Sequence, residues 1–206
     1  MSFIPLLVLL SIGGWPTTLP GFSIALTLDE QLPATVACHA VAEAAALWGP
    51  YNVAITGSSL AGPCGGGSPL RRPDAMLTVR VSPPGADAGR AWSSPFGSIR
   101  FLSDSDPEST IWLHYDAMIT LGLRTISLNG VREPSWPRDV RDRVLSRMIG
   151  RVVAHEIGHW LLRSRHHAPA GMMRAHQTTD DLADPGRRGF TLMLTDVARL
   201  RETLTR

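Results

Sequence analysis

A long helical pattern between residues 137 and 163 constrains the fold more than any other feature of the chain. Its apolar residues recur at the three- and four-residue intervals that gather them on one face of an α-helix. They are Val140, Val144, Leu145, Met148, Ile149, Val152 and Ile157. Ser135 is a candidate cap for this helix, and Pro137 is compatible with its first turn. The pattern therefore predicts the central helix of a packed domain.

Shorter patterns surround this helix. Residues 34–48 are Ala-rich with apolar positions at helical spacing, so they are expected to form a helix. Alternating residues predict strands at 51–56, 76–81, 97–102 and 110–115. Thr195 is expected to cap a final helix over 196–204. The Pro-rich residues 15–33 are expected to be a lead-in, and the Gly- and Pro-rich residues 58–73 a loop. This order of elements predicts an α+β domain.

The composition excludes several classes of protein. A length of 206 residues, 44% of them hydrophobic, fits one domain with a packed core and excludes wholesale disorder. The formal net charge of +2 is too near neutral to indicate a nucleic-acid partner. All 20 basic residues are arginine, and Ala, Gly and Pro are common, which indicates GC-rich codon use and a bacterial source. Arginines along and after the long helix exclude a protease embedded in the bilayer.

The N-terminus carries an apolar run, Phe3 to Gly14, that is too short to cross a bilayer, since a helical span needs about 20 residues. Its length and position are typical of a signal peptide, although no Lys or Arg precedes it. Ser23 and Ala25 are suited to cleavage after Ala25, so residues 1–25 are expected to be a signal peptide and 26–206 a single domain. The chain is then expected to be periplasmic or extracellular, or anchored if the segment is retained. A buried strand or helix at the start of the fold is the other interpretation.

The chain has two cysteines, Cys38 and Cys64. Their spacing matches no zinc pattern, and an exported compartment permits a disulfide bond between them. Two separate buried thiols are the alternative.

Residues 155–159 have the sequence His-Glu-Ile-Gly-His and lie on the predicted long helix. Because His155 and His159 are one turn apart on the same face, both imidazoles can reach one metal ion. Zinc binds neutral imidazole nitrogen in tetrahedral geometry. Glu156 lies about 100° round the helix from His155, where it can accept a proton from water bound to the ion. The motif therefore predicts a catalytic zinc site with Glu156 as its general base.

Two histidines do not complete a catalytic zinc site, because a third protein ligand is needed. The candidates are Asp180, Asp181 and Glu202 from later segments, and His166 and His167 from just past the same helix. If the helix continued, His166 would lie roughly 16 Å along the axis from His155, too far to share an ion. The helix is therefore expected to end soon after His159 and the chain to fold back, although no glycine stands at the required turn.

The stretch HEIGHWLLRSRHHAPAGMMRA, residues 155–175, resembles the metzincin clan of zinc endopeptidases, especially its matrixin-like branch. In that clan HExxH is followed by xxGxxH and by a tight turn that contains a methionine. Leu162 stands at the usual glycine position and Arg165 at the usual third histidine. The stretch is more similar to compact bacterial members in which the third histidine falls slightly later. On that alignment His167 matches the third ligand, with His166 as the alternative, and Met173 matches the methionine of the turn.

The resemblance implies a metzincin-like domain in which a small mixed sheet packs on the early helix and the long active-site helix. It implies one catalytic zinc ion held by His155, His159 and His167, with Met173 beneath it. The expected reaction is hydrolysis of a peptide or protein substrate that pairs as an extended strand with an edge strand, either 97–102 or 110–115. A monomer without a transmembrane span is expected.

Two other functions are compatible with the same residues. One is a zinc-stabilised binding or structural protein without turnover, and the other is a zinc hydrolase that does not act on peptides. Glu156 argues against the first, because a structural site has no use for a base.

Overall fold

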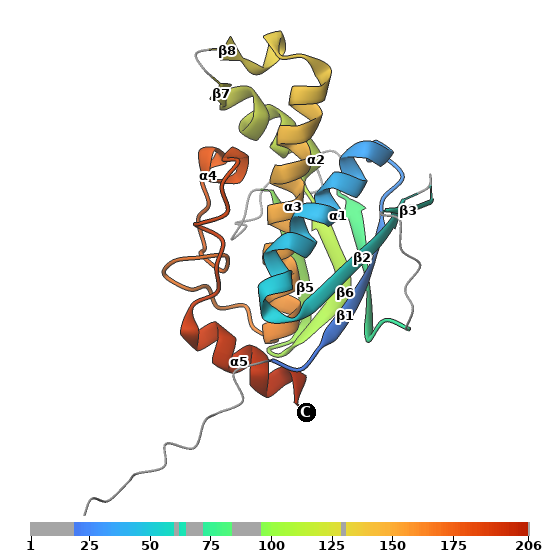
Figure 1. Ribbon diagram of the computed structural model, residues 1–206, viewed down its shortest axis with the longest axis vertical. Coiled ribbons are helices and arrows are strands. Elements are labelled where there is room, and N and C mark those ends of the chain that lie inside the picture. The colour runs from blue at the N-terminus through green and yellow to red at the C-terminus, as the bar shows by residue number, and fades with distance from the viewer. Residues whose placement is uncertain (1–18, 60–61, 65–71, 84–95, 129–130, 206) are drawn as a thin grey trace, which may run out of the picture.

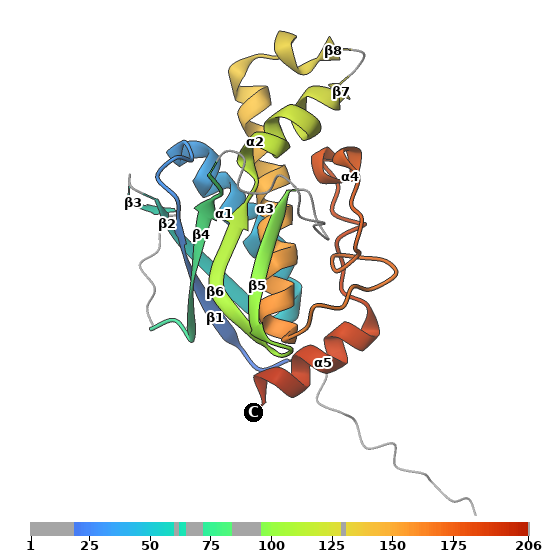
Figure 2. The same ribbon diagram turned by 180° about the vertical axis from the view of Figure 1, so that it is seen from behind.

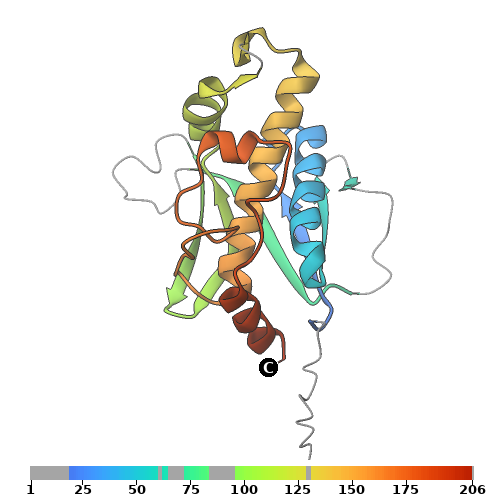
Figure 3. The ribbon, with the colours of Figure 1, turned by 60° about the vertical axis from the view of Figure 1, so that its left-hand side comes forward.

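The computed structural model describes residues 19–59, 62–64, 72–83, 96–128 and 131–205. It is an α+β domain in which two helices cover one face of a mixed sheet (Figures 1 and 2). The helices are α1 (Ala34–Trp48) and α3 (Arg138–Leu162), and they pack side by side (Figure 3). The predicted fold class and both of these helices are confirmed.

The sheet has six strands in the order β3-β2-β1-β4-β6-β5. They are β1 (Phe22–Leu28), β2 (Val53–Ser59), β3 (Gly62–Cys64), β4 (Ala75–Val81), β5 (Gly97–Ser103) and β6 (Asp106–Leu113). The four inner strands β2, β1, β4 and β6 run parallel, whereas β3 and β5 run antiparallel at the two edges. Strand β6 is thus flanked on both sides, whereas no described strand pairs with the outer side of β5.

Strand β1 corrects the expectation that residues 15–33 are a lead-in, and it bears on where a signal peptide could be cleaved. Residues 22–28 are not part of a lead-in, because they form an inner strand between β2 and β4 with Ile24, Leu26 and Leu28 buried. A domain boundary after Ala25 would divide this strand, so any cleavage that leaves the sheet whole has to fall before Phe22. The apolar run Phe3–Gly14 lies outside the described residues, and export stays a prediction.

The remaining strand predictions hold with shifted ends. The strands predicted at 76–81 and 97–102 are β4 and β5, each one residue longer than expected. The strand predicted at 51–56 begins at Val53, because Gly49–Tyr51 form a short 3-10 helix. The strand predicted at 110–115 begins earlier, at Asp106, and ends at Leu113. The loop predicted at 58–73 is wrong at its start, where residues 58–59 belong to β2 and residues 62–64 form β3.

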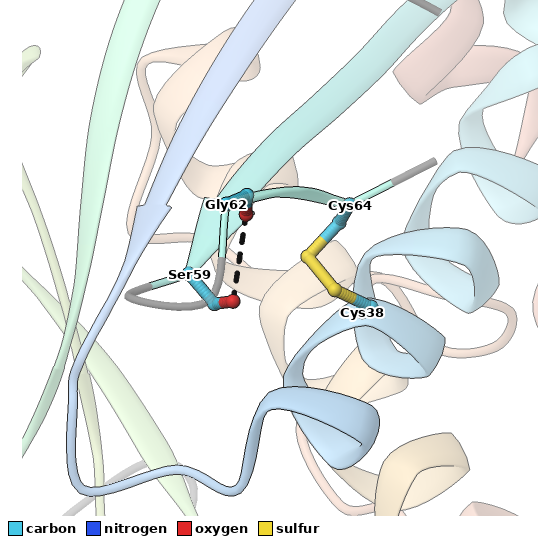
Figure 4. The surroundings of a disulfide bond; sticks show 4 residues. All are labelled: Cys38, Ser59, Gly62 and Cys64. Carbon is cyan, nitrogen blue, oxygen red and sulfur yellow. Dashed lines mark hydrogen bonds between the residues drawn. A yellow bond between two sulfur atoms is a disulfide. The ribbon is translucent and has the colours of Figure 1, made fainter. Parts of the chain in front are cut away.

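A disulfide bond joins Cys38 on α1 to Cys64 on β3 (Figure 4). The two Cα atoms are 4.7 Å apart, within the range that the bond requires. The alternative of two separate thiols is therefore wrong. The bond ties the short edge strand β3 to the helix that covers the sheet.

The segments around α3 are short. They comprise α2 (Tyr115–Ala117), the π-turn Met118–Gly122, the 3-10 turns Leu123–Thr125 and Glu133–Ser135, and the hairpin β7 (Ser127–Leu128) and β8 (Val131–Arg132). After α3 come α4 (Thr179–Ala183) and α5 (Leu194–Leu204). The predicted caps are wrong, because Pro137 precedes α3 in place of Ser135 and Met193 precedes α5 in place of Thr195. Among the described residues, no helix has the length and apolar character to cross a membrane.

A buried ion pair fastens the segment after α3 to the two large helices. The side chain of Arg151 on α3 is fully buried, and its Nε donates to Glu43 of α1 at 3.1 Å. The same guanidinium donates to backbone carbonyls of Asp181, Leu182 and Gly186. These contacts hold residues 181–186 against α3, and the next residue, Arg187, pairs with Glu43 of α1 at 2.6 Å.

Candidate metal centre

The end of α3 determines which later residues can approach its histidines. Arg163 adopts the left-handed conformation, with φ 46° and ψ 50°, and the helix stops at Leu162. The next backbone N–H, that of Ser164, donates to the carbonyl of His159 at 3.2 Å. The predicted reversal is therefore confirmed, and an arginine takes the conformation for which a glycine was missing.

The reversal brings His167 back to the two histidines of the helix. The ring nitrogens offered by His155, His159 and His167 all lie within 4.8 Å of one another. His166 does not join them, since its side chain is exposed and its backbone N–H donates to the Ser164 hydroxyl. The structure thus separates the two candidates in favour of His167.

The three acidic candidates for a third ligand are not in this group of histidines. Asp181 accepts hydrogen bonds from Thr178 as a helix-capping residue and pairs with Arg174 at 2.7 Å. Asp180 and Glu202 are exposed.

Hydrogen bonds orient two of the imidazole rings toward a common point. Nδ1 of His155 lies 2.8 Å from the carbonyl of Met172, and Nδ1 of His159 lies 2.6 Å from the carbonyl of Ser164. Because a carbonyl only accepts, each Nδ1 carries the hydrogen and each Nε2 is left with a lone pair. Backbone carbonyls fix metal-binding histidines in this way.

The Nε2 atoms meet in an arrangement that suits a cation. Those of His155 and His159 are 3.1 Å apart, so two lone pairs face each other. Nε2 of His167 is buried without a hydrogen-bond partner. Tetrahedral zinc with bonds of about 2.0–2.1 Å would separate neighbouring ligand nitrogens by about 3.3 Å. The donor set, its spacing and the unpartnered nitrogen therefore fit one zinc ion.

Burial keeps these imidazoles neutral. It lowers the pKa of His155 to about 4 and, together with the neighbouring histidines, that of His159 to about 3. Burial also lowers the pKa of His167. A neutral imidazole is the form that binds a metal ion, so all three rings are ready to do so at neutral pH.

Glu156 lies between α3 and the edge strand β5. Its side chain is buried and accepts a hydrogen bond from the backbone of Ile99. Burial raises the pKa of this carboxyl to about 8, outweighing the lowering effect of that hydrogen bond. A divalent cation nearby would lower the pKa and favour the carboxylate. The residue predicted as the base therefore has the environment of a group that exchanges protons near neutral pH.

A tight turn after His167 packs against α3 next to the three histidines. Gly171 has φ 80°, and the backbone N–H of Arg174 closes the turn on its carbonyl at 3.2 Å. Met173 is buried against Gly158, where an added Cβ would lie 2.2 Å from its Sδ. The predicted methionine thus lies against the helix turn that connects His155 to His159.

Sequence reasoning missed several backbone atoms that shape the site. The carbonyls of Met172 and Ser164 orient the imidazoles of His155 and His159. Every residue has a backbone carbonyl, so no residue type in the sequence indicates this role. The glycine at residue 158 did stand in the motif, and a side chain there would collide with Met173.

A cavity of about 340 Å³ opens beside the cluster. It is lined by Ser98, Ile99, Phe101, Glu156, His159, Arg165 and His167. The cavity thus lies between β5, which has the free edge, and the loop that follows α3. Of the two strands considered for pairing with a substrate, β5 has a side on which no described strand pairs, whereas β6 is flanked by β4 and β5.

A scan of the chain against protein-family models finds no match, and a search of curated proteins finds no significant relative. The functional argument therefore depends on the site itself.

Proposed function

We propose that this chain is a zinc-dependent endopeptidase. One observation carries the proposal: three neutral imidazoles converge beside a buried carboxyl group, at a cavity bordered by the edge strand β5. Three protein ligands leave a fourth position for water or substrate, as catalytic zinc sites do. The cavity next to His159 and His167 provides the room for it.

The three histidines, Glu156 and strand β5 would have separate roles in the reaction. His155, His159 and His167 would hold the ion. When bound, zinc supplies a Lewis acid that acidifies a water molecule and polarises the substrate carbonyl. Glu156 would accept the proton of the attacking water and deliver it to the leaving amine. The free edge of β5 would bind the substrate as an added antiparallel or parallel strand, which places a peptide bond next to Glu156.

The resemblance to metzincins supports the same function. On that resemblance His167 is the third ligand, Met173 is the methionine of the turn, and an edge strand binds the substrate. A structural zinc site would be closed by four ligands, and the open cavity speaks against that alternative. A hydrolase for other substrates would have no use for a strand edge beside its base.

We also propose that the protein is exported. Disulfide bonds persist in oxidising compartments and are rare in the cytosol, and the bond between Cys38 and Cys64 agrees with an oxidising location.

The test uses the full chain, with zinc content and cleavage of an unfolded protein substrate such as casein as readouts. Wild type should bind one zinc ion and cleave. Glu156→Gln should keep its zinc and lose cleavage by about 10²- to 10⁴-fold, the range for a general base. His167→Ala should lose zinc. His166→Ala is the matched control: His166 is adjacent but exposed, so this variant should keep both zinc binding and cleavage. A folded wild type without zinc, or one that binds zinc without cleaving any unfolded substrate, would overturn the proposal.

A further inference from the structure

The wall of the cavity contains a cation that has no carboxylate partner among the described residues. Arg165 lines it together with Glu156 and His159. Two other arginines near the site are paired, Arg163 with Asp106 at 4.0 Å and Arg174 with Asp181 at 2.7 Å. Arg165 forms no ion pair with any described residue; its guanidinium stacks on the ring of Phe101 at 5.1 Å.

The guanidinium occupies part of the edge to which a substrate strand would bind. Its Nη2 donates to the carbonyls of Phe101 and Ser103, at 3.3 and 3.5 Å. The pairing of β5 with β6 changes register between Ile99 and Phe101 and again between Phe101 and Ser103, so the contacts, and not a regular alternation, show which backbone groups face away from β6. The backbone N–H of Ile99 donates to Glu156. Glu156 and Arg165 thus bind successive backbone groups along this side of β5, and Arg165 covers the part at Phe101 and Ser103.

A substrate strand that pairs with this side of β5 has to replace Arg165 as the hydrogen-bond donor to the carbonyls of Phe101 and Ser103. Both contacts are at the long end of the hydrogen-bond range, so they are weak and readily exchanged. The displaced guanidinium, which is exposed, keeps its charge beside the cavity at which the proposed metal ion would bind. A carboxylate on the incoming peptide can then accept two parallel hydrogen bonds from it, in the geometry that arginine favours.

We propose that Arg165 is a specificity-determining residue that selects peptides carrying an acidic side chain beside the strand paired with β5. The inference rests on the proposed function, because it takes the ligand to be an extended peptide. An amide at the same peptide position would recover less of the lost interaction, and a lysine there would be repelled.

Peptide binding tests this inference separately from catalysis. The probe is a set of fluorescent ten-residue peptides in which a single Glu is moved through a neutral background, each with a partner that has Gln at that position. Binding is measured by anisotropy to the zinc-loaded Glu156→Gln protein, which cannot turn the peptides over. At one or two adjacent positions the Glu peptide should bind about three- to tenfold more tightly than the Gln peptide, as an arginine–carboxylate pair in a half-open cleft gives.

Three further substitutions, each in the Glu156→Gln background, assign the effect to Arg165. Arg165→Gln should abolish the preference and Arg165→Lys should keep part of it. Arg163→Gln should leave the preference for Glu intact. This substitution removes the same charge from the same loop, but Arg163 does not line the cavity. Equal binding of Glu and Gln peptides, an equal loss in Arg163→Gln, or no binding of any peptide would overturn the inference.

Wild-type cleavage of the same peptides separates this inference from the proposed function. Cleavage without a preference for Glu would leave the endopeptidase in place and remove the role of Arg165. Arg165-dependent binding without cleavage would do the reverse.

Discussion

The ion pair between Glu43 and Arg151 should be the most sensitive polar contact of the fold. Arg151 is fully buried and Glu43 is 7% exposed, so neither charge is solvated by water. Glu43→Gln leaves the Arg151 guanidinium with a neutral amide oxygen and the carbonyls of the segment after α3 as partners, and it also removes the charge that Arg187 binds. Removing one member of a buried pair costs about 3–5 kcal/mol, and the retained amide oxygen puts the expected loss near 3 kcal/mol. That is a large share of the roughly 5–15 kcal/mol that stabilises a domain.

The same helix provides the control for this prediction. Asp139 and Arg143 form an ion pair one turn apart on α3, with side chains 69% and 63% exposed. Asp139→Asn should therefore cost about 0.5 kcal/mol or less. Urea unfolding followed by circular dichroism, with EDTA present so that metal binding does not contribute, gives both values. Losses that agree within 0.5 kcal/mol would refute the reasoning from burial.

Two other predictions concern the turn below the site and the disulfide bond. Gly171→Ala should weaken zinc binding and cost more than about 1 kcal/mol, because its φ is 80° and the added Cβ would lie 2.1 Å from a backbone oxygen. Gly189→Ala is the control, since nothing lies within 4 Å of the Cβ that it would add. Zinc affinity, from titration with a fluorescent competitor, and the free energy of unfolding in urea are compared for the two variants. Equal losses in both variants would contradict the role of the turn. Cys64→Ser removes a cross-link between residues 26 apart and should cost about 3.5 kcal/mol by chain entropy. Zinc affinity should be unchanged, and a large loss of zinc would mean that the sheet edge supports the site.

The parts of the fold predicted correctly are those with local causes. The helix of residues 138–162 follows from apolar spacing within its own length, and the pair His155 and His159 follows from the helix. Strand β1 was missed because prolines flank it and an apolar run precedes it, although its own alternation was present. Its place between β2 and β4 is a property of chain topology, which a single segment does not encode.

The site shows the same division between local and distant causes. The sequence limited the third ligand to a few residues, and His167 was preferred to His166 on resemblance alone. What separates them in space is the left-handed conformation at Arg163, an unfavourable one for any residue but glycine, so no propensity predicts it. Which strand has the free edge likewise depends on the order of the whole sheet.

The histidine cluster and the buried ion pair depend on each other through α3. Arg151 is one helical turn before His155, and it holds residues 181–186 against the helix. The turn that presents the Met172 carbonyl to His155 lies in the chain between this anchor and the helix end. The cluster itself buries Nε2 lone pairs that no donor satisfies, at a cost of about 1–3 kcal/mol for each unsatisfied group. A bound cation would remove that cost, so metal binding should stabilise the same segment that the ion pair holds in place.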